Sequence, residues 1–307
     1  MLKTLLNESV WDLDLEAIDP LLVKAGGITL SGPDAQWLET RNRHGETVQV
    51  IPGTTIKGAF RAYGEKILRT LRAPVCNPFV KENRPDRFCG QAFDRRQHHV
   101  SASAAYAEAC PACRLFGSTH FIGRFQPADA MPDRKLLAES RDGVGIDRVS
   151  GGAYSGAKFE YSVVPAGSVF RTRIAVQNFE MWQMGLLALI LRDFMAGFIR
   201  IGSGKARGLG GVKAHLTGWR LYQFGKNAPG REVRGIGAQM EQAGEPYRLI
   251  AQPDTVSLPE ALAASWQREG LRWSLSIPKG EHEPVLASMS EVFIACAEAN
   301  RLPRVAQ

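Results

Sequence analysis

After the turn at Pro52-Gly53, apolar residues recur at helical spacing: Ile56, Ala59, Phe60, Tyr63, Ile67 and Leu68. This spacing predicts an amphipathic helix that ends near Leu71 and that Thr54 or Thr55 could cap. A second stretch further along, MWQMGLLALILRDFMAG, is apolar on nearly every face. It predicts a helix that is largely buried.

Segments with strand character lie on both sides of these helices. They are residues 14–30, which end in the Gly26-Gly27 turn, then VQVIPG, 121–125, 144–149, 159–164, SVFRTRIAVQNF and GGVKAHLTGW. A Gly/Ser-rich tip, GGAYSG, follows the segment 144–149, which predicts a long hairpin. Two helices with strands before and after each predict an α+β chain with a split βαβ, ferredoxin-like (RRM-like) core and large insertions. Such a sheet is a common platform for RNA.

Two regions depart from this pattern. Residues 73–120 are rich in Cys, Pro and charge with little periodicity, which predicts an irregular insertion that needs a staple. Beyond Gln223 the composition changes, and the segment GKNAPGREVRG is typical of a linker. We therefore expect a core over residues 1–222 and a C-terminal lobe over residues 223–307.

The composition is that of a globular protein, with 44% apolar and 22% charged residues among 307. The longest apolar stretch, Met184 to Ile190, is too short to cross a bilayer, so no membrane association is expected. The N-terminus lacks the apolar region and cleavage site of a signal peptide. A cytoplasmic protein is the expectation.

The net charge of +7 permits a polyanionic partner, and the charge is concentrated locally. No acidic residue lies between Asp193 and Glu232, a stretch that holds several basic ones: Arg200, Lys205, Arg207, Lys213, Arg220, Lys226 and Arg231. This local positive charge favours nucleic acid, while a solvated basic face without a partner is the alternative.

The segment IGSGKARGLGG, Ile201 to Gly211, follows a helix and precedes a strand, the reverse of the order in a dinucleotide site. It is not a P-loop either, because Ala206 follows Lys205 where Ser or Thr is required. Its glycines leave the backbone free to approach phosphate oxygens, with Lys205 and Arg207 between them. The alternative is an unusual loop that needs positive φ at several positions.

The segment IPGTTIKGAFR places Thr54, Thr55 and Lys57 at the start of a helix, where free amides and the helix dipole attract anions. A phosphate could bind there. An ordinary capped helix with exposed Lys57 and Arg61 has the same sequence pattern, so both interpretations stay open.

Four cysteines lie in the irregular insertion: Cys76, Cys89, Cys110 and Cys113. The last two form CPAC, a spacing that lets both thiolates reach one metal, and a structural zinc site is the physical expectation. His98 or His99 could replace one of the first two ligands. A redox-active CxxC is the competing interpretation, and Cys296 is expected to be a buried core residue.

Taken in order, IPGTTIKGAFR, CPACRLFGS, GIDRVSGGAYSGAKFEYSVVPAGSVF and SGKARGLGGV make the chain resemble the RAMP superfamily of CRISPR-Cas proteins over residues 14–222. It looks most like the backbone subunit that polymerises along guide RNA (crRNA) in type III and type IV effector complexes. The resemblance implies a ferredoxin-like palm and a thumb hairpin, here about residues 142–165, that wedges into the guide–target duplex.

The same resemblance assigns residues to these roles. The candidate thumb contacts are Val144, Ile146, Arg148, Val149 and Tyr154. The guide phosphates would be held by Thr54, Thr55, Lys57 and Arg61 together with Gly204, Lys205, Arg207, Gly208 and Gly210. The implied partners are crRNA, a target DNA or RNA, copies of the chain itself in a filament, and other effector subunits of an antiviral ribonucleoprotein.

Type III relatives cut target RNA with an Asp that follows the first strand. Asp34 is the candidate here, but Ala35, Gln36 and Trp37 follow it, so the surrounding pattern is not kept. This departure favours a type IV binding subunit over a metal-dependent endoribonuclease at Asp34. A zinc-stabilised scaffold that binds only protein is a third alternative.

Overall fold

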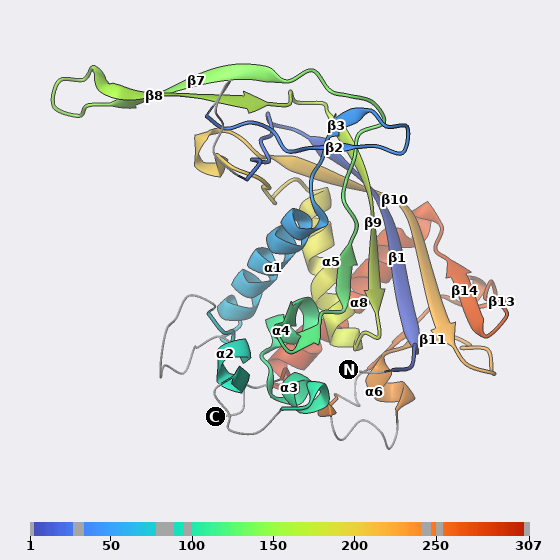
Figure 1. Cartoon of the computed structure of the whole chain (residues 1–307). Helices are drawn as coiled ribbons and strands as arrows, with labels where there is room; N and C mark the ends of the chain where they lie inside the picture. The colour runs from blue at the N-terminus through green and yellow to red at the C-terminus, as the bar shows by residue number, and fades with distance from the viewer. Residues whose placement is uncertain are drawn as a thin grey trace.

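The computed structural model of the chain describes residues 3–26, 34–77, 89–94, 100–240, 247–249 and 254–303. Its centre is an antiparallel sheet whose strands lie in the order β13-β14-β10-β1-β9-β6 (Figure 1). The strands are β13 (Gln267–Glu269), β14 (Arg272–Ser276), β10 (Val212–Phe224), β1 (Asn7–Ala17), β9 (Val169–Gln177) and β6 (Phe125–Pro127). The fold is therefore mixed α+β with a mainly antiparallel sheet.

Strand β1 is the central strand, and its residues alternate between the two faces of the sheet. Trp11, Leu13 and Leu15 point into the core and are at most 1% exposed, whereas the acidic residues between them are partly accessible. The predicted strand over residues 14–30 is thus wrong at both ends, because the alternation begins earlier and β1 ends three residues before Pro20. Proline lacks the N–H that an interior strand needs.

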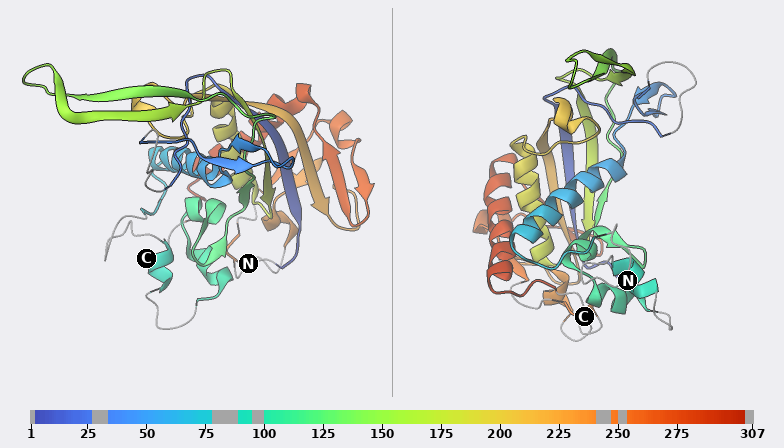
Figure 2. Two further views of the ribbon diagram at one scale, coloured as in Figure 1. Left: turned by 45° about the horizontal axis from the view of Figure 1, so that its top comes forward. Right: turned by 90° about the vertical axis from the view of Figure 1, so that its left-hand side faces the viewer.

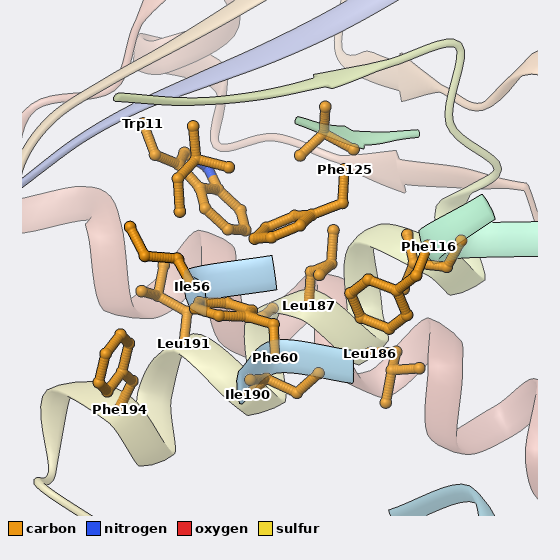
Figure 3. Packing of buried hydrophobic residues seen from close by; sticks show 14 of the residues in the cluster. Trp11, Ile56, Phe60, Phe116, Phe125, Leu186, Leu187, Ile190, Leu191 and Phe194 are labelled. Carbon is orange, nitrogen blue, oxygen red and sulfur yellow. The ribbon is translucent and has the colours of Figure 1, made fainter. Parts of the chain in front are cut away.

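Three helices cover one face of the sheet: α1 (Gly53–Thr70), α5 (Met181–Met195) and α8 (His282–Glu298). Helix α5 packs between α1 and α8 and is buried along most of its length, as its apolar sequence predicts (Figure 2). The ring of Phe60 on α1 stacks on Phe125 with 4.7 Å between centroids, and meets Phe194 edge-on at 5.6 Å (Figure 3). The core is therefore aromatic where α1 meets the sheet.

The start of α1 differs from the predicted cap. The N-cap residue is Pro52, and neither Thr54 nor Thr55 caps the helix. Instead, the Gly53 amide donates a 2.7 Å hydrogen bond to the carboxylate of Asp129, which is 76 positions away in the sequence. A remote side chain therefore satisfies one of the free amides of the first turn, as a cap would.

The insertion between α1 and β6 is more regular than predicted. It contains α2 (Cys89–Asp94), α3 (Ala102–Glu108) and α4 (Pro111–Phe116), followed by the short hairpin of β4 (Gly117–Ser118) and β5 (Phe121–Ile122). These helices have six or seven residues each, too few to produce a clear helical period in the sequence.

The predicted long hairpin is confirmed and is formed by β7 (Glu139–Ile146) and β8 (Ala153–Val163). It extends away from the body of the molecule, and its first strand begins at Glu139, slightly before the predicted start (Figure 1). A small two-stranded sheet of β2 (Glu39–Arg41) and β3 (Thr47–Gln49) lies nearby.

Residues after 223 continue the main sheet, because β14 pairs with the second half of β10 and β13 pairs with β14. The other elements here are β11 (Glu232–Arg234), α6 (Ile236–Gln239), β12 (Thr255–Ser257), α7 (Glu260–Ala263) and the 3-10 turn η3 (Lys279–Glu281). None of the described helices is long and apolar enough to cross a membrane.

A buried carboxyl joins this C-terminal segment to α5. Asp254 is 1% exposed and accepts hydrogen bonds from the backbone amides of Met181, at the start of α5, and Ala238, at 3.0 Å. Burial, with a further contribution from the nearby Glu180, raises the pKa of Asp254 to about 8. The folded protein therefore holds a proton here that the unfolded chain, with an ordinary carboxyl, releases near pH 4.

Stability should consequently fall as the pH rises from about 4 to about 8, by on the order of a few kcal/mol, because the folded state binds the extra proton across this range. The measurement is chemical unfolding of the wild type and Asp254→Asn at several pH values. The wild type should lose stability across this range, while the variant, which cannot titrate, should give a flatter profile. Equal slopes for the two proteins would contradict this assignment.

Candidate functional site

The start of α1 and the glycine-rich loop lie side by side under the base of the β7–β8 hairpin (Figure 1). An open cavity of about 300 Å³ separates them, lined by Lys24 and Thr55 on one side and Ser203 and Lys205 on the other. Gly58 also lines it, from the second turn of α1. Two segments that are about 150 positions apart in the sequence, and that were each singled out for anion binding, thus form one site.

The loop holds its shape through glycine. Gly202 and Gly210 have φ of +79° and +86°, and a Cβ would lie 2.2 Å from the Leu22 carbonyl oxygen at the first and 2.3 Å from the Ile201 carbonyl oxygen at the second. The interpretation of a loop that requires positive φ is therefore correct for these positions. Gly208 also has positive φ, but nothing lies within 4 Å of its Cβ position, so its backbone is open to a ligand.

Two lysines carry unneutralised charge here: Lys205, which lines this cavity, and Lys57, on the adjoining face of α1. Lys205 is exposed, yet partial burial, and to a smaller extent the positive charge of Lys66, lowers its pKa. Burial, and then Arg61, likewise lowers the pKa of Lys57. Among the described residues, no carboxylate pairs with Lys57 or Lys205. An anion entering here would meet positive charge that the protein itself does not compensate.

The cations of the open sheet face are different, because carboxylates neutralise them. Arg173 on β9 donates to Asp12 on β1 at 2.7 Å, and Arg171 lies 3.5 Å from Asp14. Arg220 on β10 approaches Asp12 at 3.7 Å. Carboxylates of β1 thus partly neutralise Arg220, which belongs to the acid-free stretch, as well as Arg171 and Arg173 on β9.

The four cysteines of the insertion converge in the structure. Cys76, Cys89, Cys110 and Cys113 are buried, are not joined in disulfides, and place their Sγ atoms within 4.8 Å of one another. Sγ of Cys76 lies 3.4 Å from that of Cys113 and 3.6 Å from that of Cys110. A tetrahedral site with metal–sulfur bonds of about 2.3 Å has edges of about 3.8 Å, so this cluster could bind a metal ion.

Local structure favours a thiolate at Cys110 in this cluster. Cys110 is the N-cap of α4, and its Sγ accepts the backbone amide of Cys113 at 3.4 Å. Hydrogen bonds from the thiols of Cys113, Cys76 and Cys89 lower the pKa of Cys110 well below its usual value. The histidine alternatives, His98 and His99, lie outside the described residues.

A family model of the RAMP superfamily matches residues 14–213. The chain belongs to the RAMP superfamily. No curated protein sequence matches the chain. Proteins of this superfamily typically bind crRNA and work within Cas complexes, so this RAMP domain is a CRISPR-associated RNA-binding module.

One predicted phosphate contact of the RAMP domain is turned inward. Arg61 donates to Glu65 at 3.0 Å, to the Gly117 carbonyl at 3.1 Å and to Sγ of Cys113 at 3.3 Å. Burial disfavours the charged guanidinium and lowers its pKa. The interactions with Cys113 and Glu65 are stronger than this effect, so the pKa of Arg61 is raised. Arg61 therefore ties α1 to the cysteine cluster, while Thr54 remains exposed on the helix surface.

The predicted hairpin contacts are well placed to meet another molecule. Val144, Ile146, Val149 and Tyr154 are 48%, 57%, 97% and 66% exposed, respectively, although all four are apolar or aromatic. Arg148 is also exposed, at the turn between the two strands.

Sequence reasoning missed the residues that join the hairpin to the glycine-rich loop. Phe159 and Tyr161 on β8 stack with 5.9 Å between centroids, and the guanidinium of Arg207 lies 5.1 Å from the first ring and 5.9 Å from the second. Alternation along β8 could have placed both rings on one face, but nothing in the sequence links them to Arg207.

Asp34 lies at the base of the same hairpin. Its carboxylate accepts the backbone amide of Glu160 at 2.8 Å, and the neighbouring Ala35 forms a bridge with Tyr161. Among the described residues, the only group of three or more His, Cys, Asp or Glu side chains placed to hold a metal is the cysteine cluster. Within the described part of the chain, Asp34 thus helps to hold the β7–β8 hairpin in place through its bond to the backbone of β8.

Proposed function

We propose that the chain is the guide-RNA-binding backbone subunit of a CRISPR-Cas effector complex. Copies would assemble along crRNA and present it for pairing with target nucleic acid. The observation that carries the proposal is the cavity between α1 and the glycine-rich loop. Lys205 on its wall, and Lys57 on the adjoining face of α1, have no carboxylate partner among the described residues. The backbone phosphates of a single strand fit this uncompensated charge.

We further infer a ferredoxin-like palm. The elements β1, α1, β6, β9, α5 and β10 follow one another along the chain, and the sheet orders these strands as β10-β1-β9-β6. Numbered by position in the chain, this order is 4-1-3-2, which is the ferredoxin-like arrangement. The palm would comprise residues 1–222, with residues 223–307 as a C-terminal lobe.

The β7–β8 hairpin is proposed as the thumb that wedges into the guide–target duplex. Support comes from its exposed apolar side chains, Val144, Ile146 and Val149, and from the hairpin itself, which extends away from the body of the molecule (Figure 1). Apolar side chains inserted between bases are a general way to separate a stacked step.

A structural zinc ion is proposed for the four cysteines. The short sulfur–sulfur separations, the burial and the amide contacts to sulfur fit tetrahedral thiolate ligation. With zinc bound, the guanidinium of Arg61 would face a thiolate ligand and compensate part of its negative charge.

A type IV subunit is favoured over a type III endoribonuclease. The alternative function places target-RNA cleavage at Asp34, which would require a free carboxylate beside other metal ligands. The hydrogen bond from Glu160 to Asp34, and the lack of further metal-binding carboxylates around it among the described residues, support a binding role.

The test is co-purification with RNA. The chain expressed with a CRISPR array and its partner subunits should elute as a large particle with nucleic-acid absorbance, and nuclease treatment should break the particle down. An RNA-free monomer under these conditions would contradict the proposal. Periodic cutting of complementary RNA, lost in Asp34→Ala, would support the endoribonuclease instead.

A further inference from the structure

Helix α1 carries a glycine that nothing in the described chain requires. Gly58 lies in the second turn, is exposed, and has no atom within 4 Å of its Cβ position. Gly64 on the same helix differs, because a Cβ there would lie 3.1 Å from Ile190. Glycine inside a helix lowers stability relative to alanine, so a packing reason is expected at such a position.

A groove lies on the other side of α1 from the glycine-rich loop. It has a volume of about 640 Å³ and runs between α1 and the β4–β5 hairpin. Lys57, Thr119, His120 and Ile122 contribute to its walls, and Ile122 is 69% exposed.

The charges around this groove favour an anion. No acidic side chain lines it among the residues that the structure describes. Of the described carboxylates near its walls, Glu65 is engaged by Arg61 and Asp94 by His120, at 3.0 and 3.3 Å. The ammonium of Lys57 has no such partner among the described residues.

The groove therefore combines an unneutralised cation, hydroxyl and imidazole groups, and an exposed apolar side chain. This is the chemistry that binds a nucleotide, with its phosphate on the cation and its base against the apolar wall. Gly58 lies on the ridge between the two cavities, since it lines the first one while Lys57, beside it, lines the second.

We propose that the groove between α1 and β4–β5 is a second nucleotide subsite, and that the RNA strand reaches it from the glycine-rich loop by crossing α1 at Gly58. The inference rests on the proposed RNA-binding function. The proposed subsite lies outside the glycine-rich loop and the β7–β8 hairpin. It also explains the glycine at position 58, because the absence of a side chain lets the RNA strand contact the helix closely.

The first experiment separates ligand contact from stability at Gly58. Gly58→Ala should raise the melting temperature by about 2 °C, because alanine favours the helix, and should weaken binding of fluorescein-labelled oligouridine about fivefold. Gly280→Ala is the matched control at another glycine with open space around it, and its RNA affinity should equal that of the wild type. An unchanged RNA affinity of Gly58→Ala would contradict the proposed path of the RNA strand across α1.

The second experiment changes the charge in the groove in both directions. Thr119→Glu should weaken oligouridine binding about tenfold and Thr119→Lys should strengthen it, because one repels the phosphate and the other attracts it. Damage to the hairpin would instead weaken binding in both variants. The control pair, Ser276→Glu and Ser276→Lys at an exposed position on β14, should leave the affinity unchanged.

These outcomes distinguish the subsite from the proposed function. If the wild type binds oligouridine, Lys205→Ala weakens binding and both Thr119 variants bind like the wild type, the second subsite is refuted and the RNA-binding function stands. If the wild type binds no RNA in any assembly, both proposals fail together.

Discussion

Cys113→Ser is expected to remove the metal from the purified protein and to lower its melting temperature by about 10 °C. The wild type should contain about one zinc per chain by elemental analysis, and the variant should contain almost none. Without a cation, four buried thiolates would repel one another. Zinc binds only to the folded state, so its binding free energy adds to the stability of the insertion.

The fifth cysteine provides the control. Cys296 is also fully buried but lies on α8, outside the cluster, so Cys296→Ser should keep its zinc even if some stability is lost. A wild-type protein without metal, or a Cys113→Ser protein with full zinc occupancy, would contradict the zinc assignment.

Removing three cations from the start of α1 and the glycine-rich loop is expected to weaken RNA binding by about two to three orders of magnitude at moderate salt. The variant is Lys57→Ala, Lys205→Ala and Arg207→Ala combined. Each lost phosphate contact reduces the slope of log affinity against log salt by about 0.7 for a single strand, so the slope should fall by about 2. The loss should be similar for RNAs of different sequence, because backbone contacts do not read bases.

The matched control removes the same number of positive charges from the open sheet face. Arg171→Ala, Arg173→Ala and Arg220→Ala combined lower the net charge equally, but in the wild type these arginines are paired with carboxylates on β1. RNA affinity and salt slope should stay within about twofold of the wild type. Equal losses in both triple variants would mean that net charge, rather than the site, drives binding.

The sequence was sufficient for features that depend on neighbours along the chain. Helical spacing identified α1 and α5, and the Gly/Ser-rich tip identified the β7–β8 hairpin. The CPAC spacing singled out two of the cysteines that the fold brings together with Cys76 and Cys89. Each of these features depends on residues that are close together in the sequence, so the local pattern is enough to predict it.

The sequence was insufficient where a partner is remote. Asp129 binds the first amide of α1, and Cys113 and Gly117 engage Arg61, across 52 to 76 positions. Arg220 lies in an acid-free stretch, yet Asp12 on the neighbouring strand approaches it. Only the fold decides which cations are neutralised, and therefore which face is positive.

The proposed function depends on the binding of the guide strand by α1 and the glycine-rich loop. Its most direct test is photocrosslinking of the assembled ribonucleoprotein with 4-thiouridine RNA, with the attached peptides identified by mass spectrometry. We expect crosslinks in the peptides that contain residues 53–61 and 201–211. Crosslinks confined to peptides of the open sheet face, such as those with Arg171 and Arg173, would contradict this mode of binding.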